Sequence, residues 1–453
     1  MKIKFIILLL FFIFHFSFFI PHFLYAQESG TEAVQLNTIK YGTETEIANL
    51  IQTLKTEGVD YLDNEIIALV ENTRNQKILA GAFAFFGERE KSGLESRAIR
   101  AIEERDEEGN ETVLAAIDYV GRVKATSAAP VLQGLIERGD RFFINAAFRS
   151  LGRISGSGKD SADTTAEYLV DFYQNRNPGD DNRRDMIAAM GAAGSAKAVE
   201  FLADIATDNN GRVVLRMAAL EAIAQIGDPG GLEAVLTCVG ANDPNVRSTA
   251  VTALGPFSGS AVDEAILDAF RDSYYRTRIA AAQASRQRKL AAAVPYLQFR
   301  AERDEVPAVR DDSIRALGAI ANGEAIKILE NLFTERKNSD RVRLIAGEMI
   351  MQIQPEKFLD NMVKEMDEAK QKNQTALYNG FLKIIGSAKS SNMEAITRRL
   401  MGNTGVVEKS FALDMAANNN LTSLASEIRT IAEGKNESLA AKARRTLAKL
   451  GLQ

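Results

Sequence analysis

The chain has 453 residues, 46% of them hydrophobic and 25% charged, a composition typical of a folded protein and too apolar for a disordered one. This length suits two or three ordinary domains or one long repeat array. The formal net charge is −5, which argues against a general nucleic-acid binder, because such proteins usually carry a basic excess.

The N-terminus has the layout of an export signal. Lys2 and Lys4 precede an apolar run over residues 5–20, and the small residue Ala26 follows shortly after it. Basic, apolar and small regions in this order are typical of a secretory signal peptide. We therefore predict a signal peptide over residues 1–26, with an uncleaved membrane anchor as the alternative. Export places the chain in the periplasm or outside the cell, and only an uncleaved leader would attach it to a membrane.

Residues 27–43 are rich in Thr, Gly, Glu and Gln, which predicts a flexible tether between the leader and the main body. Thr43 and Glu46 have the spacing of a helix-capping box. We therefore expect the folded array to occupy residues 44–453.

One sequence pattern recurs along this array. Segments 245–255 and 308–318 both read as a Val-Arg turn followed by a helix that ends in Ala-Leu-Gly or a close variant. Related segments end at Gly87, Gly121, Gly152, Gly191, Gly227, Gly386 and Gly451. Neighbouring glycines lie about 28 to 39 residues apart where none is missing, a period typical of repeat architectures.

Each period predicts a helical hairpin. Apolar residues in 323–334 and in 230–239 recur at helical spacing and form one stripe. Asp243 followed by Pro244 is a helix start signal, and a glycine after a helix suits a left-handed C-cap. Because one pair cannot bury its apolar face alone, the pairs must stack. We predict an all-α protein, a right-handed α-solenoid (superhelix) of about twelve antiparallel helix pairs.

The Asp/Asn-x-x-Val-Arg turn and the Ala-Leu-Gly helix end, clearest in 243–255 and 309–318, resemble the HEAT family in the short variety seen in bilin-lyase-type repeats. The resemblance covers nearly the whole array and implies a fold rather than an activity. It also implies that the arginines Arg247, Arg310 and Arg343 join a ladder of hydrogen bonds. Their expected partners are Asp243 and Asp340.

Few residues are available for catalysis. Both histidines, His15 and His22, lie in the leader, so a mature chain without the leader has no histidine for a catalytic triad or a zinc site. The single cysteine, Cys238, lies on or beside an apolar helix face, where a buried thiol is expected. We predict no metal, no cofactor and no enzymatic activity. The alternative is an enzyme or enzyme subunit acting on envelope material through Asp or Glu side chains.

One segment is unusually basic. Residues 273–301 contain no acidic side chain and include a helix over 276–288. As a second helix of its pair, this helix is expected on the concave side of the solenoid. The residues predicted to bind a partner are Tyr275, Arg276, Arg278, Arg286, Arg288, Lys289 and Arg300.

The basic residues admit two interpretations. Arginine and tyrosine are enriched at interface hot spots, which favours a docking patch. Alternatively, some of these charges pair with Asp272, Glu302 or Asp304, and Arg278 is one more ladder arginine. The sequence thus predicts an exported, non-catalytic scaffold or adaptor. Its partner is a protein or an anionic envelope polymer, bound on the concave face.

Overall fold

The computed structural model describes residues 31–176, 179–403 and 405–452. The predicted leader, residues 1–26, lies outside the described residues. Every regular element within the described ranges is a helix, and the chain divides into two compact units, the first ending at Gly231 and the second beginning at Leu232.

The helices alternate between the first and the second member of a pair. In unit 1 the first helices are α3 (Asp63–Asn72), α5 (Glu95–Glu103), α7 (Ala129–Arg138), α9 (Lys159–Arg176) and α11 (Val199–Thr207). The second helices are α2 (Glu44–Glu57), α4 (Gln76–Glu88), α6 (Asn110–Arg122), α8 (Ile144–Ser155), α10 (Asp180–Ala193) and α12 (Val213–Ile226).

Unit 2 continues the same alternation. Its first helices are α13 (Leu232–Val239), α15 (Ser260–Ala269), α17 (Val294–Arg303), α19 (Gly323–Thr334), α21 (Pro355–Gln371), α23 (Met393–Met401) and α25 (Ala425–Ala432). Its second helices are α14 (Pro244–Ala253), α16 (Tyr275–Arg288), α18 (Pro307–Ile320), α20 (Asp340–Ile353), α22 (Thr375–Ser387), α24 (Val406–Asn418) and α26 (Glu437–Lys449).

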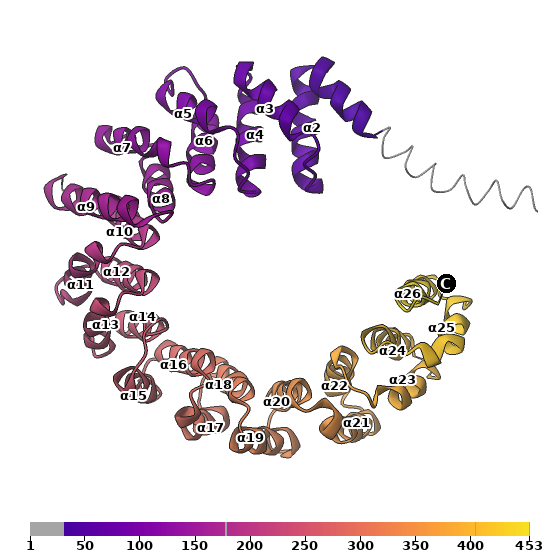
Figure 1. Ribbon diagram of the computed structural model, residues 1–453. Coiled ribbons are helices and arrows are strands. Elements are labelled where there is room, and N and C mark those ends of the chain that lie inside the picture. The colour runs from indigo at the N-terminus through magenta and orange to yellow at the C-terminus, as the bar shows by residue number, and fades with distance from the viewer. Residues whose placement is uncertain (1–30, 177–178, 404, 453) are drawn as a thin grey trace, which may run out of the picture. The chain divides into compact units, whose positions relative to one another are not determined.

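Within each unit the helices form two layers. Each second helix packs against its own first helix and against the second helices before and after it. Figure 1 shows the second helices on the inner side of each unit and the first helices on the outer side. We call the second helices of a unit its inner layer. The predicted all-α solenoid is confirmed, and the described part contains twelve pairs from α3–α4 to α25–α26.

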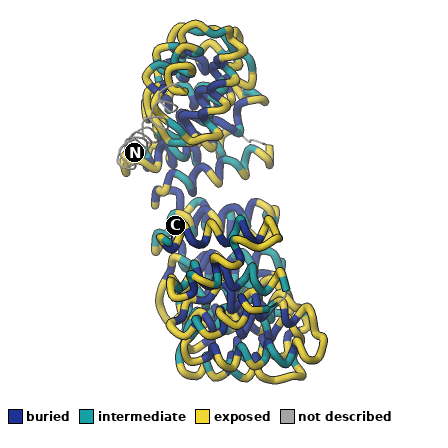
Figure 2. Tube along the Cα trace, turned by 90° about the vertical axis from the view of Figure 1, so that its right-hand side faces the viewer, coloured by how far each residue is buried: buried dark blue, intermediate teal, exposed yellow. Residues whose placement is uncertain are grey.

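The core lies between the two layers. In unit 2 one cluster of buried side chains runs from Val251 to Leu450, and buried residues fill the interior of each unit in Figure 2. Phe333 of α19 lies in this cluster, with its ring 5.1 Å from that of Phe358 and 5.7 Å from that of Phe381. Cys238 is only 1% exposed, so the predicted buried thiol is confirmed.

The predicted flexible tether differs from the structure over part of its length. Residues 31–41 are helical, and the Ile39 side chain is buried. Leu36 and Ile39 are three residues apart, so they share one side of this helix and give it an apolar face. The capping box of Thr43 and Glu46 is confirmed at the start of α2.

Most of the repeat glycines do not act as the left-handed caps that we predicted. Only Gly227 and Gly451 have positive φ, at 70° and 68°. Six others lie inside second helices, namely Gly87, Gly121, Gly152, Gly191, Gly318 and Gly386, and Gly255 lies in the turn after α14. A Cβ added at Gly152 would lie 2.6 Å from the carbonyl oxygen of Ala189 in α10. Here glycine is required because neighbouring second helices approach closely.

Candidate functional site

The basic segment, residues 273–301, forms α16, a second helix of unit 2, and most of α17, the first helix of the next pair. The four alanines Ala280, Ala281, Ala282 and Ala284 are buried in α16 and let its neighbours approach. The opposite face carries Arg276, Ile279, Gln283 and Arg286, none of which is buried. This face is the solvent-accessible side of α16 in the inner layer.

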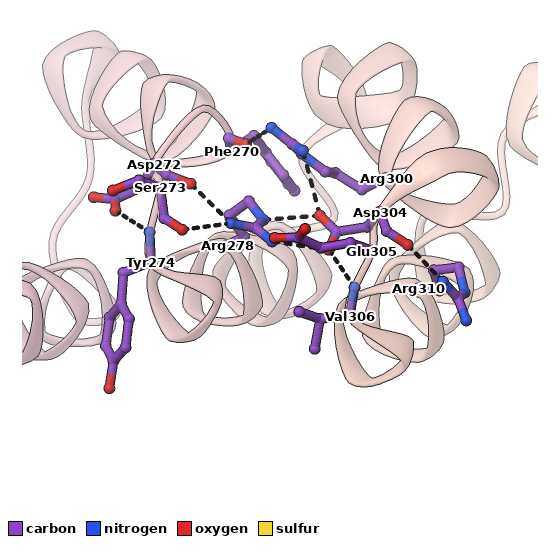
Figure 3. A network of polar contacts seen from close by, with 10 residues as sticks. All are labelled: Phe270, Asp272, Ser273, Tyr274, Arg278, Arg300, Asp304, Glu305, Val306 and Arg310. Carbon is purple, nitrogen blue, oxygen red and sulfur yellow. Dashed lines mark hydrogen bonds and ion pairs between the residues drawn. The ribbon is translucent and has the colours of Figure 1, made fainter.

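Arg278 does not lie on this face, because its guanidinium is held inside the protein. Nε and Nη2 donate to the two carboxylate oxygens of Asp304 at 2.8 and 2.9 Å. Nη1 donates to the backbone carbonyls of Asp272 and Ser273, both at 3.0 Å. The Arg278 side chain is 5% exposed and that of Asp304 is 0% exposed. Figure 3 shows this network, and it confirms the interpretation of Arg278 as a ladder arginine.

Arg300 and Arg288 are also engaged. Arg300 donates to the carboxylate of Asp304 at 3.3 Å and to the carbonyl of Phe270 (Figure 3). Arg288 donates from Nη2 to the carboxylate of Asp263 in α15 at 2.8 Å, and from Nη1 to the carbonyl of Phe257 at 2.6 Å. Three of the seven predicted binding residues therefore hold neighbouring helices together.

The partner predicted for Arg247 was wrong. Arg247 donates from Nε and Nη2 to the carboxylate of Asp272, at 2.7 and 3.0 Å, in the turn of the next repeat. Asp243 instead caps its own helix by accepting from the backbone N–H groups of Asn245 and Val246. The arginine reaches forward because the carboxylate in its own turn is occupied by the helix start.

The other ladder arginines follow the same logic. Arg343 donates to Glu365 at 2.5 Å and not to Asp340, which is the first residue of its own helix. Arg310 donates to the backbone carbonyl of Asp304 and contacts no carboxylate within the described ranges. These arginines tie turns together and are not available to a ligand.

Arg216, which was not predicted from the sequence, occupies the same place, the fourth residue of a second helix. It is 4% exposed and donates to the carbonyl of Ala206 at 2.8 Å. Arg216, Arg247 and Arg278 follow one another at intervals of 31 residues. That spacing was the signal that could have identified it.

Two ladder carboxylates, Asp304 and Asp272, have a pKa below the ordinary value. Burial acts to raise the pKa of Asp304, but hydrogen bonds from Arg278 and from the backbone N–H of Val306 outweigh it, and the pKa lies below its ordinary value. Burial also acts to raise the pKa of Asp272, but hydrogen bonds from Arg247 and from the backbone N–H of Tyr274 outweigh it. The positive charges of Arg278 and Arg247 are thus compensated inside the fold.

Four predicted binding residues remain available, and we call them the α16 patch: Tyr275, Arg276, Arg286 and Lys289. Tyr275 is 36% exposed, and its hydroxyl accepts a hydrogen bond from Nε of Arg276 at 3.2 Å. Neither Arg286 nor Lys289 pairs with any carboxylate of the described chain. Their charges therefore face solvent without an internal counter-ion.

Arg315 is a further cation of the inner layer that was not predicted from the sequence. It lies on α18, the next second helix, is partly exposed, and has no ionic partner in the described ranges. Arg286 and Arg315 are both on the inner layer, and α16 packs directly against α18. Arg315 was not predicted because it lies beyond residues 273–301, the acid-free segment from which the binding residues were chosen.

Elsewhere in the described chain, few side chains are placed for metal binding or acid–base catalysis. No three Asp, Glu, His or Cys side chains of these residues come together as a metal site, and no described helix is long and apolar enough to cross a membrane. The carboxyl of Asp185 has a pKa raised by burial, and its ionic contact is Arg149 at 4.0 Å.

Comparison with protein-family models gave a match to the family described as "Spirochaete HEAT repeat protein" over residues 39–446. Comparison with curated protein sequences gave no significant match. Among solved structures, the karyopherin Kap121p bound to the extreme C-terminus of the protein phosphatase Cdc14p is 12% identical, with a TM-score of 0.45. The match covers 92% of this chain and 53% of the karyopherin, so the chain spans about half of its length.

A crystal structure of importin beta is also similar, at 12% identity with a TM-score of 0.42. This second match covers 92% of this chain and 72% of importin beta.

Proposed function

Because the chain belongs to the spirochaete HEAT repeat protein family, we propose that it is an exported, non-catalytic scaffold or adaptor that binds a protein partner on the inner layer of its solenoid. Stacked repeats present a continuous surface that suits a large partner better than a small substrate. The main support for the proposal is a difference between the cations of one basic segment. Some of them pair with carboxylates inside the fold, and others have no such partner among the described residues.

The difference between paired and unpaired cations determines which of them can bind a partner. Arg278, Arg288 and Arg300 are fixed by carboxylates and carbonyls, so they form a rigid support. Arg276 and Arg286 project from that support without an internal carboxylate. Cations on a rigid helix attract an acidic partner, and the backbone that presents them is already ordered before binding. We therefore propose a protein partner with an acidic surface, docked over the α16 patch.

Tyr275 adds an anchor of another kind. Its ring is partly exposed, and the guanidinium carbon of Arg276 lies 5.9 Å from the ring centroid. Tyrosine supplies apolar contact area and a hydroxyl at once, and it is enriched at interface hot spots. The α16 patch thus combines charge with a surface that can exclude water.

Export and the absence of catalysis are parts of the same proposal. The basic, apolar and small regions of residues 1–26 support export to the periplasm or the cell exterior. The lack of histidine outside the leader supports a non-catalytic role. The chain would reach a membrane only through an uncleaved leader.

The test is chemical crosslinking in intact cells, followed by purification of the chain and mass spectrometry. Wild type is compared with Arg276→Glu/Arg286→Glu, which reverses two uncompensated charges. Arg288 is left unchanged, because its loss would break the contact with Asp263 in α15. Lys327→Glu/Lys364→Glu is the matched control, since both lysines are exposed on outer helices of unit 2 and pair with no described carboxylate.

The proposal predicts one protein captured by wild type and by the control, and lost from the patch variant. Capture of the same protein by all three would remove the α16 patch from the proposal. If no protein is captured, the purified chain is tested for cosedimentation with anionic envelope polymer. Binding there would make the polymer the partner, and its absence would contradict a scaffold role.

A further inference from the structure

A second candidate surface lies in unit 2, away from the α16 patch, near the C-terminal end of the array. It is a groove between the outer helices α23 and α25, bounded by the loops that lead into α24 and α26. Its lining residues include Met401, Gly402, Lys409, Ile431, Lys435 and Leu439. The groove holds about 460 Å³, within the range of about 300–1,000 Å³ typical of ligand pockets.

The floor of the groove is apolar. Met401, Ile431 and Leu439 come from three different helices, and each is less than a tenth exposed. They belong to the packed core of unit 2 or adjoin it, so the floor is rigid. A bulky apolar side chain placed there would bury area against side chains that are already ordered.

Gly402 lines the groove and has no side chain. Its φ is −73°, which any residue adopts, so the backbone does not require glycine here. A Cβ added at Gly402 would make only ordinary contacts, at 3.6 and 3.8 Å, with two backbone oxygens. Unlike Gly152, this glycine is not explained by the packing of neighbouring helices.

The rim carries uncompensated positive charge. Arg398 and Glu427 line the groove as an ion pair, and Arg398 also contacts Glu394 at 2.8 Å. Lys409 and Lys435 have no carboxylate partner in the described chain. After the pair has cancelled, the rim is left with the two lysines, which complement a negatively charged group.

We propose that this groove binds a segment of a protein partner in which a bulky apolar side chain stands next to a carboxylate. The apolar side chain occupies the floor formed by Met401, Ile431 and Leu439. The adjacent carboxylate pairs with Lys409 or Lys435 at the rim. The contact is independent of the α16 patch, which lies on an inner helix.

The test uses fluorescence anisotropy with two labelled peptides, one made of four Asp-Leu-Glu repeats and one of four Asp-Gly-Glu repeats. The two carry the same charge and differ in the apolar side chain. The full chain is compared with Lys409→Glu/Lys435→Glu, and with Thr430→Trp, which fills the groove from an exposed position on α25. Lys327→Glu/Lys364→Glu is the charge control.

We expect the leucine peptide to bind wild type at least tenfold more tightly than the glycine peptide. Each groove variant should lose at least tenfold in affinity for it, while the control and Arg276→Glu/Arg286→Glu stay within twofold of wild type. Equal binding of the two peptides, unchanged binding by the groove variants, or no binding at 1 mM peptide would each overturn the proposal. Loss of binding in the Arg276→Glu/Arg286→Glu variant alone would place the peptide on the α16 patch and would also overturn it.

Discussion

Replacing Asp304 by asparagine should destabilise the centre of unit 2 strongly. The side chain keeps its size but loses its charge. Asp304 is fully buried and accepts hydrogen bonds from Arg278, from Arg300 and from the backbone N–H of Val306. With asparagine in place, the buried Arg278 guanidinium has no strong counter-ion, since Glu305 lies 3.8 Å away and is 84% exposed.

The magnitude follows from burial. Removing one partner of a buried ion pair typically costs about 3–5 kcal/mol, because an uncompensated charge stays inside the protein. Asp268→Asn in α15 is the matched control, since Asp268 pairs with Arg271 at 2.6 Å but both side chains are more than 60% exposed. Exposed pairs of this kind contribute about 0–1 kcal/mol.

Hydrogen exchange measured by mass spectrometry suits a repeat array, because such arrays open locally rather than in one step. Each 1.4 kcal/mol corresponds to about a tenfold change in protection. We expect Asp304→Asn to reduce the protection of α16 and α18 by roughly two to four orders of magnitude, with α24 and α26 unchanged. If Asp304→Asn loses no more protection than Asp268→Asn, the ladder does not stabilise the array as we argue.

Three further predictions concern stability and reactivity. Gly152→Ala should cost about 1–3 kcal/mol in urea unfolding, because its Cβ would overlap Ala189, whereas Gly158→Ala, with nothing within 4 Å, should leave the midpoint unchanged. The pKa of Asp272 is depressed in the folded state. Its contribution to the free energy of unfolding is therefore complete above the unfolded pKa of about 3.9 and is lost as the pH falls through the folded pKa. Asp272→Asn should flatten the decline in stability between pH 5 and pH 2. The Cys238 thiol should react with a thiol reagent only after unfolding, and fast labelling of the native chain would contradict its burial.

Local signals in the sequence were enough to predict the helices and their stacking. The helix predicted over 323–334 coincides with α19, because its apolar stripe and the adjacent Asn322 cap act within a few residues of chain. Turn signals such as Asp243 before Pro244 work in the same way. The resemblance of these turns to HEAT repeats then gave the solenoid, since a helix pair with one apolar face has to stack.

Contacts between repeats were harder to predict. The partner of Arg288 is Asp263, 25 residues earlier, and the partner of Arg247 is Asp272, 25 residues later. Which residues meet depends on how far one helix slides along the next, and the pattern within a repeat does not determine that distance. For the same reason the role of Gly152 as a close contact with α10 could not be distinguished from a cap.

The basic segment illustrates what composition can predict and what it cannot. Its composition correctly drew attention to α16, but composition cannot separate a compensated cation such as Arg278 from an uncompensated one such as Arg286. That distinction needs the neighbouring helices in place. The groove at Gly402 had no signal in the sequence, since its apolar floor reads as ordinary core.

The central claim is that a protein partner lies over the inner layer of unit 2. It is tested most directly by placing a photo-crosslinking amino acid at Gln283, in the middle of the exposed face of α16, and separately at Lys327 on the outer helix α19. After irradiation of cells, we predict a defined crosslinked protein from position 283 and none from position 327. A crosslink from position 327 alone would place the partner on the outer helices and contradict the account.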